Sequence, residues 1–345
     1  MIDSNRFIHC LKTAIALFIG IIIVRAFNMP VQGRWILISV LLVMCAQSRI
    51  GALMQKSYMR FLGSLMGACI AALTLYLAYP SVIWTTLALC FTAALFSYIA
   101  DSPSYLSEAS SVGAITVLII MTSQPPSYAI AIDRCFEISL GILLAFLVSR
   151  FMFPLRSRTY LRRSLISTLI ELKTLSEQLR VWNSAKAEKA YIAYDEKVIT
   201  HLVMQNQLYR EVRRESFDRA DLARIFSDIL AGEREIFRYL NLMQQALSLF
   251  SEEVGACINE QALVQSIYEM SQRTFTSIIN QVETEQHSNL IEFLDNFSDW
   301  GNKMRQQLEP LTKNASDKFA VDLFIFAAGR LLARLHKMHP LINKV

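Results

Sequence analysis

The sequence predicts an all-α protein in which a six-span transmembrane helical bundle is followed by a soluble helical domain. The uneven charge distribution is the first indication: residues 1–155 contain only nine of the 34 Lys/Arg and five of the 29 Asp/Glu residues. The same region contains six long apolar stretches, whereas the remainder has apolar residues at helical spacing. We therefore expect a transmembrane domain at residues 1–155 and a cytoplasmic helical domain at residues 156–345.

Six apolar segments are the candidate spans, because a helix that crosses a bilayer needs about 20 mostly apolar residues. They are residues 8–27, 35–47, 57–79, 82–100, 109–123 and 128–153. Prolines close most of them, namely Pro30, Pro80, Pro103, Pro125, Pro126 and Pro154. The second and fifth segments are short for a span, and the other four are long enough to cross.

Basic residues around the apolar segments predict the orientation, since cytoplasmic loops carry an excess of Lys and Arg. One cluster lies between the second and third spans, another follows the sixth, and Arg6 precedes the first. Only Arg25 and Arg34 fall on the opposite side. Both termini are therefore expected in the cytoplasm. The two clusters are Arg49, Lys56 and Arg60, and then Arg150, Arg156, Arg158, Arg162 and Arg163.

An internal repeat relates the third span to the sixth. A shift of 74 residues places Arg60 on Arg134, Gly67 on Gly141, Ala71 on Ala145, Leu73 on Leu147, Tyr79 on Phe153 and Pro80 on Pro154. Two halves of three helices insert with opposite topology, which is the inverted repeat of many secondary transporters. The short second and fifth spans occupy matching places in these halves. They indicate either a binding site or ordinary short helices in a locally thinned bilayer.

Four of the charged residues inside the apolar segments are candidate functional residues, because an ionised side chain there costs about 2.5–3.5 kcal/mol on insertion. Lys12 and Arg60 lie near the cytoplasmic ends of their spans, so they either snorkel to the interface or line a pathway. Arg134 and Glu137 share one helical face, and Glu137 lies about 14 Å inside its span. This pair is either a purely structural ion pair or part of a transport pathway. We predict a substrate or ion pathway that contains all four residues.

Gly63 and Gly67 form a G-x-x-x-G pattern in the third span, and Gly141 is the repeat partner of Gly67. Small residues at this spacing let two helices approach closely. We expect close helix packing at these glycines, either within the bundle or between protomers.

The second half of the chain predicts five or six long amphipathic helices. Its apolar residues recur at three- and four-residue spacing with strong helix formers between them. The expected breaks lie near residues 182–183, 216, 251–255, 286–288 and 310–316. The stretch 319–328 is strongly apolar, but Asp322 and Arg330 make it too short to span, so we expect a central buried helix. The repeating positions are Leu161, Leu165, Leu172, Leu175 and Leu179, and then Ile225, Ile229, Ile236, Leu240, Met243, Leu247 and Phe250.

The chain contains no pattern typical of an enzyme or a cofactor site. It has no P-loop of the form G-x-x-x-x-G-K-[ST], no H-E-x-x-H and no G-x-S-x-G, and its six cysteines lack metal or redox spacing. The net charge of +5 gives no support for nucleic-acid binding. We expect no catalytic residue, no metal site and no cofactor.

Three stretches together resemble a known family. They are Gly33-Arg-Trp35, Arg60-Phe-Leu-Gly63-Ser-Leu-Met-Gly67 and Arg134-Cys-Phe-Glu137-Ile-Ser-Leu-Gly141, the last followed by Pro154. The first 165 residues resemble the fusaric acid resistance-like family of bacterial inner-membrane proteins, which includes the aromatic acid exporters. The layout is also similar to that of the plant aluminium-activated malate transporters.

The resemblance implies export of organic anions, typically aromatic carboxylates, together with a periplasmic adaptor protein. Many members carry two copies of the membrane-plus-cytoplasmic unit, whereas this sequence has one, which suggests a homodimer. The alternative hypothesis is a membrane-anchored interaction protein that recruits partners through its cytoplasmic helical domain. A polar path lined by Arg60 and Arg134 would favour transport. A tightly packed bundle without such a path would favour the membrane-anchored interaction protein.

Overall fold

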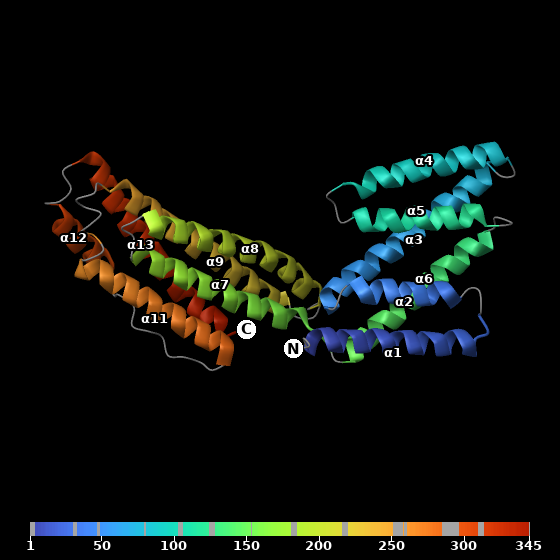
Figure 1. Cartoon of the computed structure of the whole chain (residues 1–345), viewed down its shortest axis with the longest axis horizontal. Helices are drawn as coiled ribbons and strands as arrows, with labels where there is room; N and C mark the ends of the chain where they lie inside the picture. Colours follow the sequence, from blue (N-terminus) through green and yellow to red (C-terminus); the bar gives the residue numbers. More distant parts are fainter. Residues whose placement is uncertain are drawn as a thin grey trace. The chain divides into compact units, whose positions relative to one another are not determined.

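The computed structural model describes residues 4–29, 33–46, 49–78, 81–102, 106–123, 128–152, 154–180, 185–215, 220–250, 258, 261–284, 297–309 and 314–344. Within these ranges the chain is helical and contains no strand, which confirms the all-α class. It divides into two compact units, Met1–Ser157 and Arg158–Val345 (Figure 1). Most of the predicted breaks and the prolines at 30, 80, 103, 125 and 126 lie outside the described residues, as do Tyr79 and Phe153.

Six helices make up the first unit, and each one covers a predicted apolar segment. They are α1 Ser4–Ala26, α2 Gly33–Ala46, α3 Ile50–Ala78, α4 Val82–Ala100, α5 Leu106–Thr122 and α6 Tyr128–Phe151. After α1, Asn28 takes a positive φ of 51°, a conformation that Asn tolerates better than most residues.

Helix α3 begins at Ile50, whereas the predicted third segment covers residues 57–79, which placed Lys56 in the preceding connection and Arg60 inside the span. Both residues lie inside α3, because a helix continues through charged side chains that are good helix formers. The amide of Ile50 donates a hydrogen bond to the carbonyl of Leu155, 3.2 Å away, and so satisfies one free donor of the helix end. This partner is more than 100 residues distant in the sequence, so hydropathy gave no sign of the earlier start.

Three of the six helices are long and apolar enough to cross a membrane by length and composition: α1 over Phe7–Ala26, α3 and α4. The short α2 and α5 have 14 and 17 residues, as the sequence predicted. Helix α6 has 24 residues, but it contains the four charged residues Asp133, Arg134, Glu137 and Arg150 and is not among the three. Length and composition therefore establish three candidate spans.

Helix packing in the first unit is built on two close pairs. Helix α3 packs along α5, and α6 packs along α2, while α3 and α6 also contact each other (Figure 1). A Cβ on Gly67 would lie 2.5 Å from the Gly113 carbonyl of α5, and a Cβ on Gly141 would lie 2.7 Å from the Ile36 carbonyl of α2. Gly63 meets the backbone of Ala109 on α5 in the same way. The G-x-x-x-G pattern thus serves packing within one chain.

Six described helices make up the second unit. They are α7 Ser157–Arg180, α8 Ala185–Glu215, α9 Ala220–Leu249, α11 Ala262–Thr284, α12 Phe297–Leu308 and α13 Ala315–Ile342. The leucines of α7 and most of the periodic residues of α9 are buried in one core, as predicted. Helix α13 packs against α9, α11 and α12, and its Ala320, Phe324, Ala327 and Ala328 are fully buried. One face of the predicted buried stretch is therefore in the core, whereas Phe319 and Phe326 are 61% and 51% exposed.

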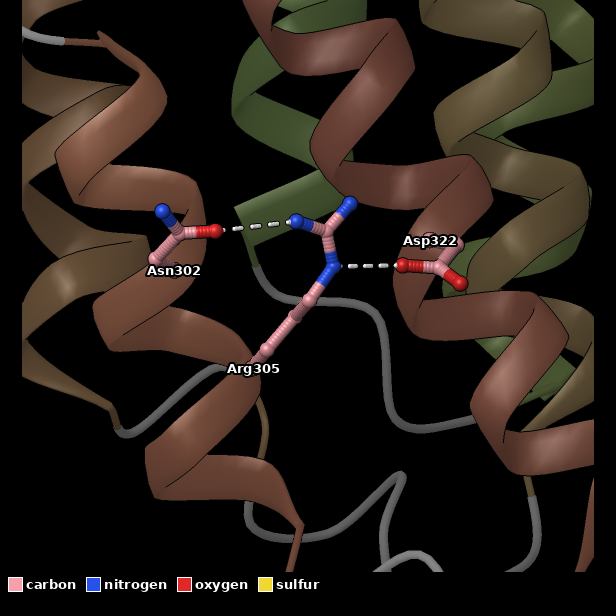
Figure 2. A network of polar contacts seen from close by, with 3 residues as sticks. All are labelled: Asn302, Arg305 and Asp322. Carbon is pink, nitrogen blue, oxygen red and sulfur yellow. Dashed lines mark hydrogen bonds and ion pairs between the residues drawn. The ribbon is translucent and has the colours of Figure 1, made fainter.

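Helix α12 is attached to its neighbours by one aromatic anchor and one surface network. Trp300 is 4% exposed and donates its Nε1–H to the carbonyl of Leu263, 3.2 Å away. On the outer side, the guanidinium of Arg305 donates to Asp322 on α13 over 2.7 Å and to Asn302 over 3.3 Å (Figure 2). Both members of the ion pair are more than half exposed.

Candidate functional site

Arg134 and Glu137 form an ion pair on α6. The Nη1 of Arg134 lies 3.1 Å from the Oε2 of Glu137, and the two side chains are 16% and 4% exposed. The spacing of three residues puts both on one face of the helix. Since α6 begins at Tyr128, Glu137 lies about 14 Å along the helix from its start. The structure thus brings together two of the four predicted pathway residues.

Trp35 adds a third group to this pair. The guanidinium carbon of Arg134 lies 4.2 Å from the centroid of the Trp35 ring, within the range of a cation–π interaction. The contact depends on the close approach of α2 to α6, where Gly141 admits the backbone of Ile36, the residue after Trp35. The sequence reading used Trp35 only as a mark of family resemblance and missed its place in the site.

Lys12 is a buried cation on α1. Its side chain is 1% exposed, and its Nζ has no hydrogen-bond partner among the described residues. His9, one turn earlier, also has an unpartnered buried nitrogen, Nδ1. Burial of Lys12 to this degree argues against the snorkelling interpretation, in which the ammonium would reach the surface.

Arg60 lies on α3 together with two buried hydroxyls. The Nε of Arg60 and the Oγ atoms of Ser57 and Ser64 are buried and have no hydrogen-bond partner within the part of the chain that the structure describes. The three residues share one helical face by their spacing. Nearby, Lys56 forms an ion pair with Glu108 of α5 over 3.5 Å. Neither serine could be singled out from the sequence, because a serine in an apolar helix carries no distinctive signal.

The basic groups do not gather in one place. Lys12 and Arg60 lie on helices other than α6, and the acidic group that acts on Arg60 is Glu108 of α5. Helix α6 runs in the opposite direction to α1 and α3 (Figure 1). Lys12 and Arg60 lie about 12 and 15 Å from the starts of their helices, and Arg134 lies about 9 Å from the start of α6. The cations are therefore distributed along the length of the unit.

The site chemistry is that of charge compensation. Arg134 pairs with Glu137 and also lies in the field of Asp133, and Glu108 acts on Arg60, whereas the ammonium of Lys12 has no hydrogen-bond partner among the described residues. Among the described residues no group of three or more His, Cys, Asp or Glu side chains lies close enough to hold a metal ion.

Apolar helices that enclose charged side chains, Lys12 and Glu137 among them, point to a multi-pass membrane protein. The family model of the fusaric acid resistance protein family matches residues 6–336, and the chain belongs to that family. Membership makes it a membrane transport protein related to efflux and favours transport over the alternative of an anchored interaction protein. The family is one of transporters and not of enzymes. A search of curated proteins found no match to this chain.

Proposed function

We propose that this protein is a secondary transporter that exports organic anions, with aromatic carboxylates as the main substrate class. The observation that carries the proposal is the buried ammonium of Lys12, which has no partner among the described residues. An uncompensated charge in a low-dielectric interior is costly, so buried charges in proteins are normally paired. An anionic substrate supplies the missing partner.

The geometry of Arg134 suits a carboxylate. Glu137 binds Nη1, whereas the buried Nε has no partner within the described residues. The edge of the guanidinium formed by Nε and Nη2 thus remains for a bidentate contact with a carboxylate. Trp35 and Glu137 fix the orientation of the guanidinium, and the hydroxyls of Ser57 and Ser64 on α3 are further donors for a moving anion.

Six spans in two inverted halves are part of the same proposal. Residues matched by the 74-residue shift have matching environments: Ala71 and Ala145 are fully buried, and Leu73 and Leu147 are exposed. The contact of α3 with α5 corresponds to that of α6 with α2, and Gly67 and Gly141 make the close approach in each. These correspondences support a pseudo-two-fold repeat with the short helices α2 and α5 at its centre.

Orientation and location follow from the basic residues and from the family. We infer a bacterial inner-membrane protein with both termini and the second unit in the cytoplasm, because cytoplasmic segments are rich in Lys and Arg. Export across a second membrane would require a periplasmic adaptor. The proton gradient or the outward gradient of the anion itself would drive the exit.

Efflux measurements test the proposal. A deletion strain should retain radiolabelled 4-hydroxybenzoate, and the wild-type gene should restore its exit. Arg134→Gln should abolish efflux at matched membrane abundance, and Arg134→Lys should weaken it because Lys lacks the planar fork. The control is Arg25→Gln, which alters an exposed arginine of α1 and should leave efflux unchanged.

The double variant Arg134→Leu/Glu137→Leu separates a structural pair from a binding site. Two apolar residues remove both the desolvation cost and the attraction of the pair, so folding should survive. Loss of efflux in a correctly inserted double variant supports binding. Wild-type efflux in that variant would make the pair structural, and unchanged retention of a panel of aromatic acids in the deletion strain would refute the export function.

A further inference from the structure

A groove of about 410 Å³ lies between α8 and α9 of the second unit. Six of its lining residues come from one stripe of α9, and Leu202 comes from α8. The walls combine two guanidinium groups and two amides with three apolar side chains, and the volume falls in the range of small-molecule sites. The α9 residues are Arg234, Phe237, Arg238, Asn241, Leu242 and Gln245.

Hydrogen bonds between the helices hold both ends of the groove. At one end Arg234 Nη1 donates to the Asn206 Oδ1 of α8 over 3.1 Å. At the other end the Tyr191 hydroxyl of α8 donates to the Asn241 Oδ1 over 2.5 Å. Burial raises the pKa of the Tyr191 hydroxyl, so this group stays protonated and remains a donor. The Asn241 amide keeps its two N–H donors for another acceptor.

Arg238 lies between these two ends, one helical turn from Arg234 and nearly one turn from Asn241. It makes no ion pair or hydrogen bond with a described residue, and its side chain is exposed. Of the acidic residues near the groove, Glu235 pairs with Arg334 over 3.0 Å, and Asp195 of α8 acts on Tyr191 and has one buried carboxyl oxygen without a hydrogen-bond partner among the described residues. The groove therefore lies between two helices joined by hydrogen bonds and has the exposed guanidinium of Arg238 at its centre.

We propose that this groove is a binding site for an organic anion with an apolar, ring-sized body. The carboxylate would lie on Arg238 with help from Asn241, and the apolar body would pack between Phe237, Leu242 and Leu202. The guanidinium and the amide supply a planar set of donors that matches a carboxylate. Lining by apolar side chains favours an aromatic acid over a small hydrophilic anion such as acetate.

The site is separate from the pathway through the first unit and does not depend on the proposed transport function. If transport also holds, the second unit binds the same class of anion that the first unit moves, which would make the groove a sensor of substrate.

Ligand binding to the full chain in nanodiscs provides the test. The probe is 4-fluorobenzoate, followed by the ¹⁹F transverse relaxation rate, and the protein carries Arg134→Gln to remove the proposed pathway contact. Arg238→Gln should weaken binding about tenfold, as expected for loss of one charge-assisted contact. The affinity of Arg238→Lys for 4-fluorobenzoate should lie between those of the parent protein and Arg238→Gln. Phe237→Ala should also weaken binding. The matched control is Arg224→Gln, an exposed arginine on the same helix outside the groove.

Two further probes distinguish the contribution of the carboxylate charge to binding from that of the aromatic ring. The neutral 4-fluorobenzamide keeps the ring, trifluoroacetate keeps only the charge, and both should bind at least tenfold more weakly than 4-fluorobenzoate. Equal binding by the parent and Arg238→Gln proteins, or equal binding of the neutral amide, would overturn the site. If the deletion strain and the wild type export 4-hydroxybenzoate equally poorly, the transport proposal is refuted. The binding result for the groove would still stand.

Discussion

Arg134 is held by two interactions of different kinds, an ion pair with Glu137 and a stack on Trp35. The ion pair places a negative charge on one side of the guanidinium, and the indole covers a face. Neither contact uses Nε. The groups that hold Arg134 in place therefore leave this donor for a ligand.

Replacement of Trp35 tests the stacking contact. Trp35→Leu keeps an apolar side chain but removes the π face, which contributes about 0.5–2 kcal/mol to holding a cation. Efflux of 4-hydroxybenzoate should fall about tenfold, while Trp35→Phe should retain part of the activity. Trp84→Leu alters a tryptophan that is 66% exposed on α4 and serves as the control. Full efflux by Trp35→Leu would remove Trp35 from the site.

Glu233 in the second unit is a buried acid with no exposed surface, and neither carboxyl oxygen makes a hydrogen bond of good geometry within the described part of the chain. Burial raises the pKa of its carboxyl well above the ordinary value of 4.5, and Gln205 and Arg234 oppose this only in part. Above pH 4.5 the folded state therefore keeps a proton on Glu233 that the unfolded state releases. Stability should consequently fall as pH rises from 4.5 toward the folded-state pKa.

Glu233→Gln should remove this pH dependence. The neutral amide needs no proton, so the variant should be more stable than the parent at pH 8 by about 1–3 kcal/mol, with a smaller difference at pH 5. Urea unfolding of the full chain in mild detergent, followed by circular dichroism at both pH values, measures the difference. An equal gain at both pH values would contradict a protonated Glu233.

At the scale of elements, the approach of α3 to α5 leaves no room for a side chain at Gly63 or Gly67. Gly63→Ala should destabilise the first unit by about 1–3 kcal/mol, because the new methyl group meets backbone that cannot rotate away. Gly20→Ala is the comparison, since the nearest atom there is the end of the Leu37 side chain, at 2.8 Å. In detergent, the midpoint temperature of thermal unfolding of Gly63→Ala should be well below that of Gly20→Ala.

The attachment of α12 should depend on its buried face and not on its surface network. Trp300→Ala should cost about 3–5 kcal/mol by leaving a cavity. Arg305→Gln should cost about 0.2–1 kcal/mol, since both partners of that ion pair are exposed to water (Figure 2). Hydrogen exchange of α12 amides measures both effects, and a larger effect of Arg305→Gln would reverse this ranking.

For the whole molecule, α8 offers a surface through which two copies could associate. Ile192, Ile199 and Val203 lie on one face of the helix and are 52%, 46% and 65% exposed. We expect a two-fold homodimer, the commonest closed assembly. Its mass in nanodiscs should be twice 39.3 kDa after subtraction of lipid and scaffold. Ile199→Glu should shift the protein toward monomer, whereas Thr200→Glu, off the stripe, should not.

Helix positions were largely predictable because apolar length and periodicity are local properties of the chain. The six segments of the first half and the leucine stripe of α7 follow directly from side-chain type. The earlier start of α3 was not predictable, since the Leu155 carbonyl that accepts from Ile50 is brought there by the fold. The charged residues of the site were visible as exceptions in apolar helices, but their partners were not.

By itself, the sequence determined the helical class, the contrast between an apolar and a charged half, and the family resemblance that the family model bore out. Only the tertiary structure decided that Gly63 and Gly67 pack within one chain, that Trp35 covers Arg134, and that Lys12 is buried without a hydrogen-bond partner among the described residues. The physical reason is that composition and periodicity act over a few residues. Burial and pairing of a charge depend on helices that meet from distant parts of the chain.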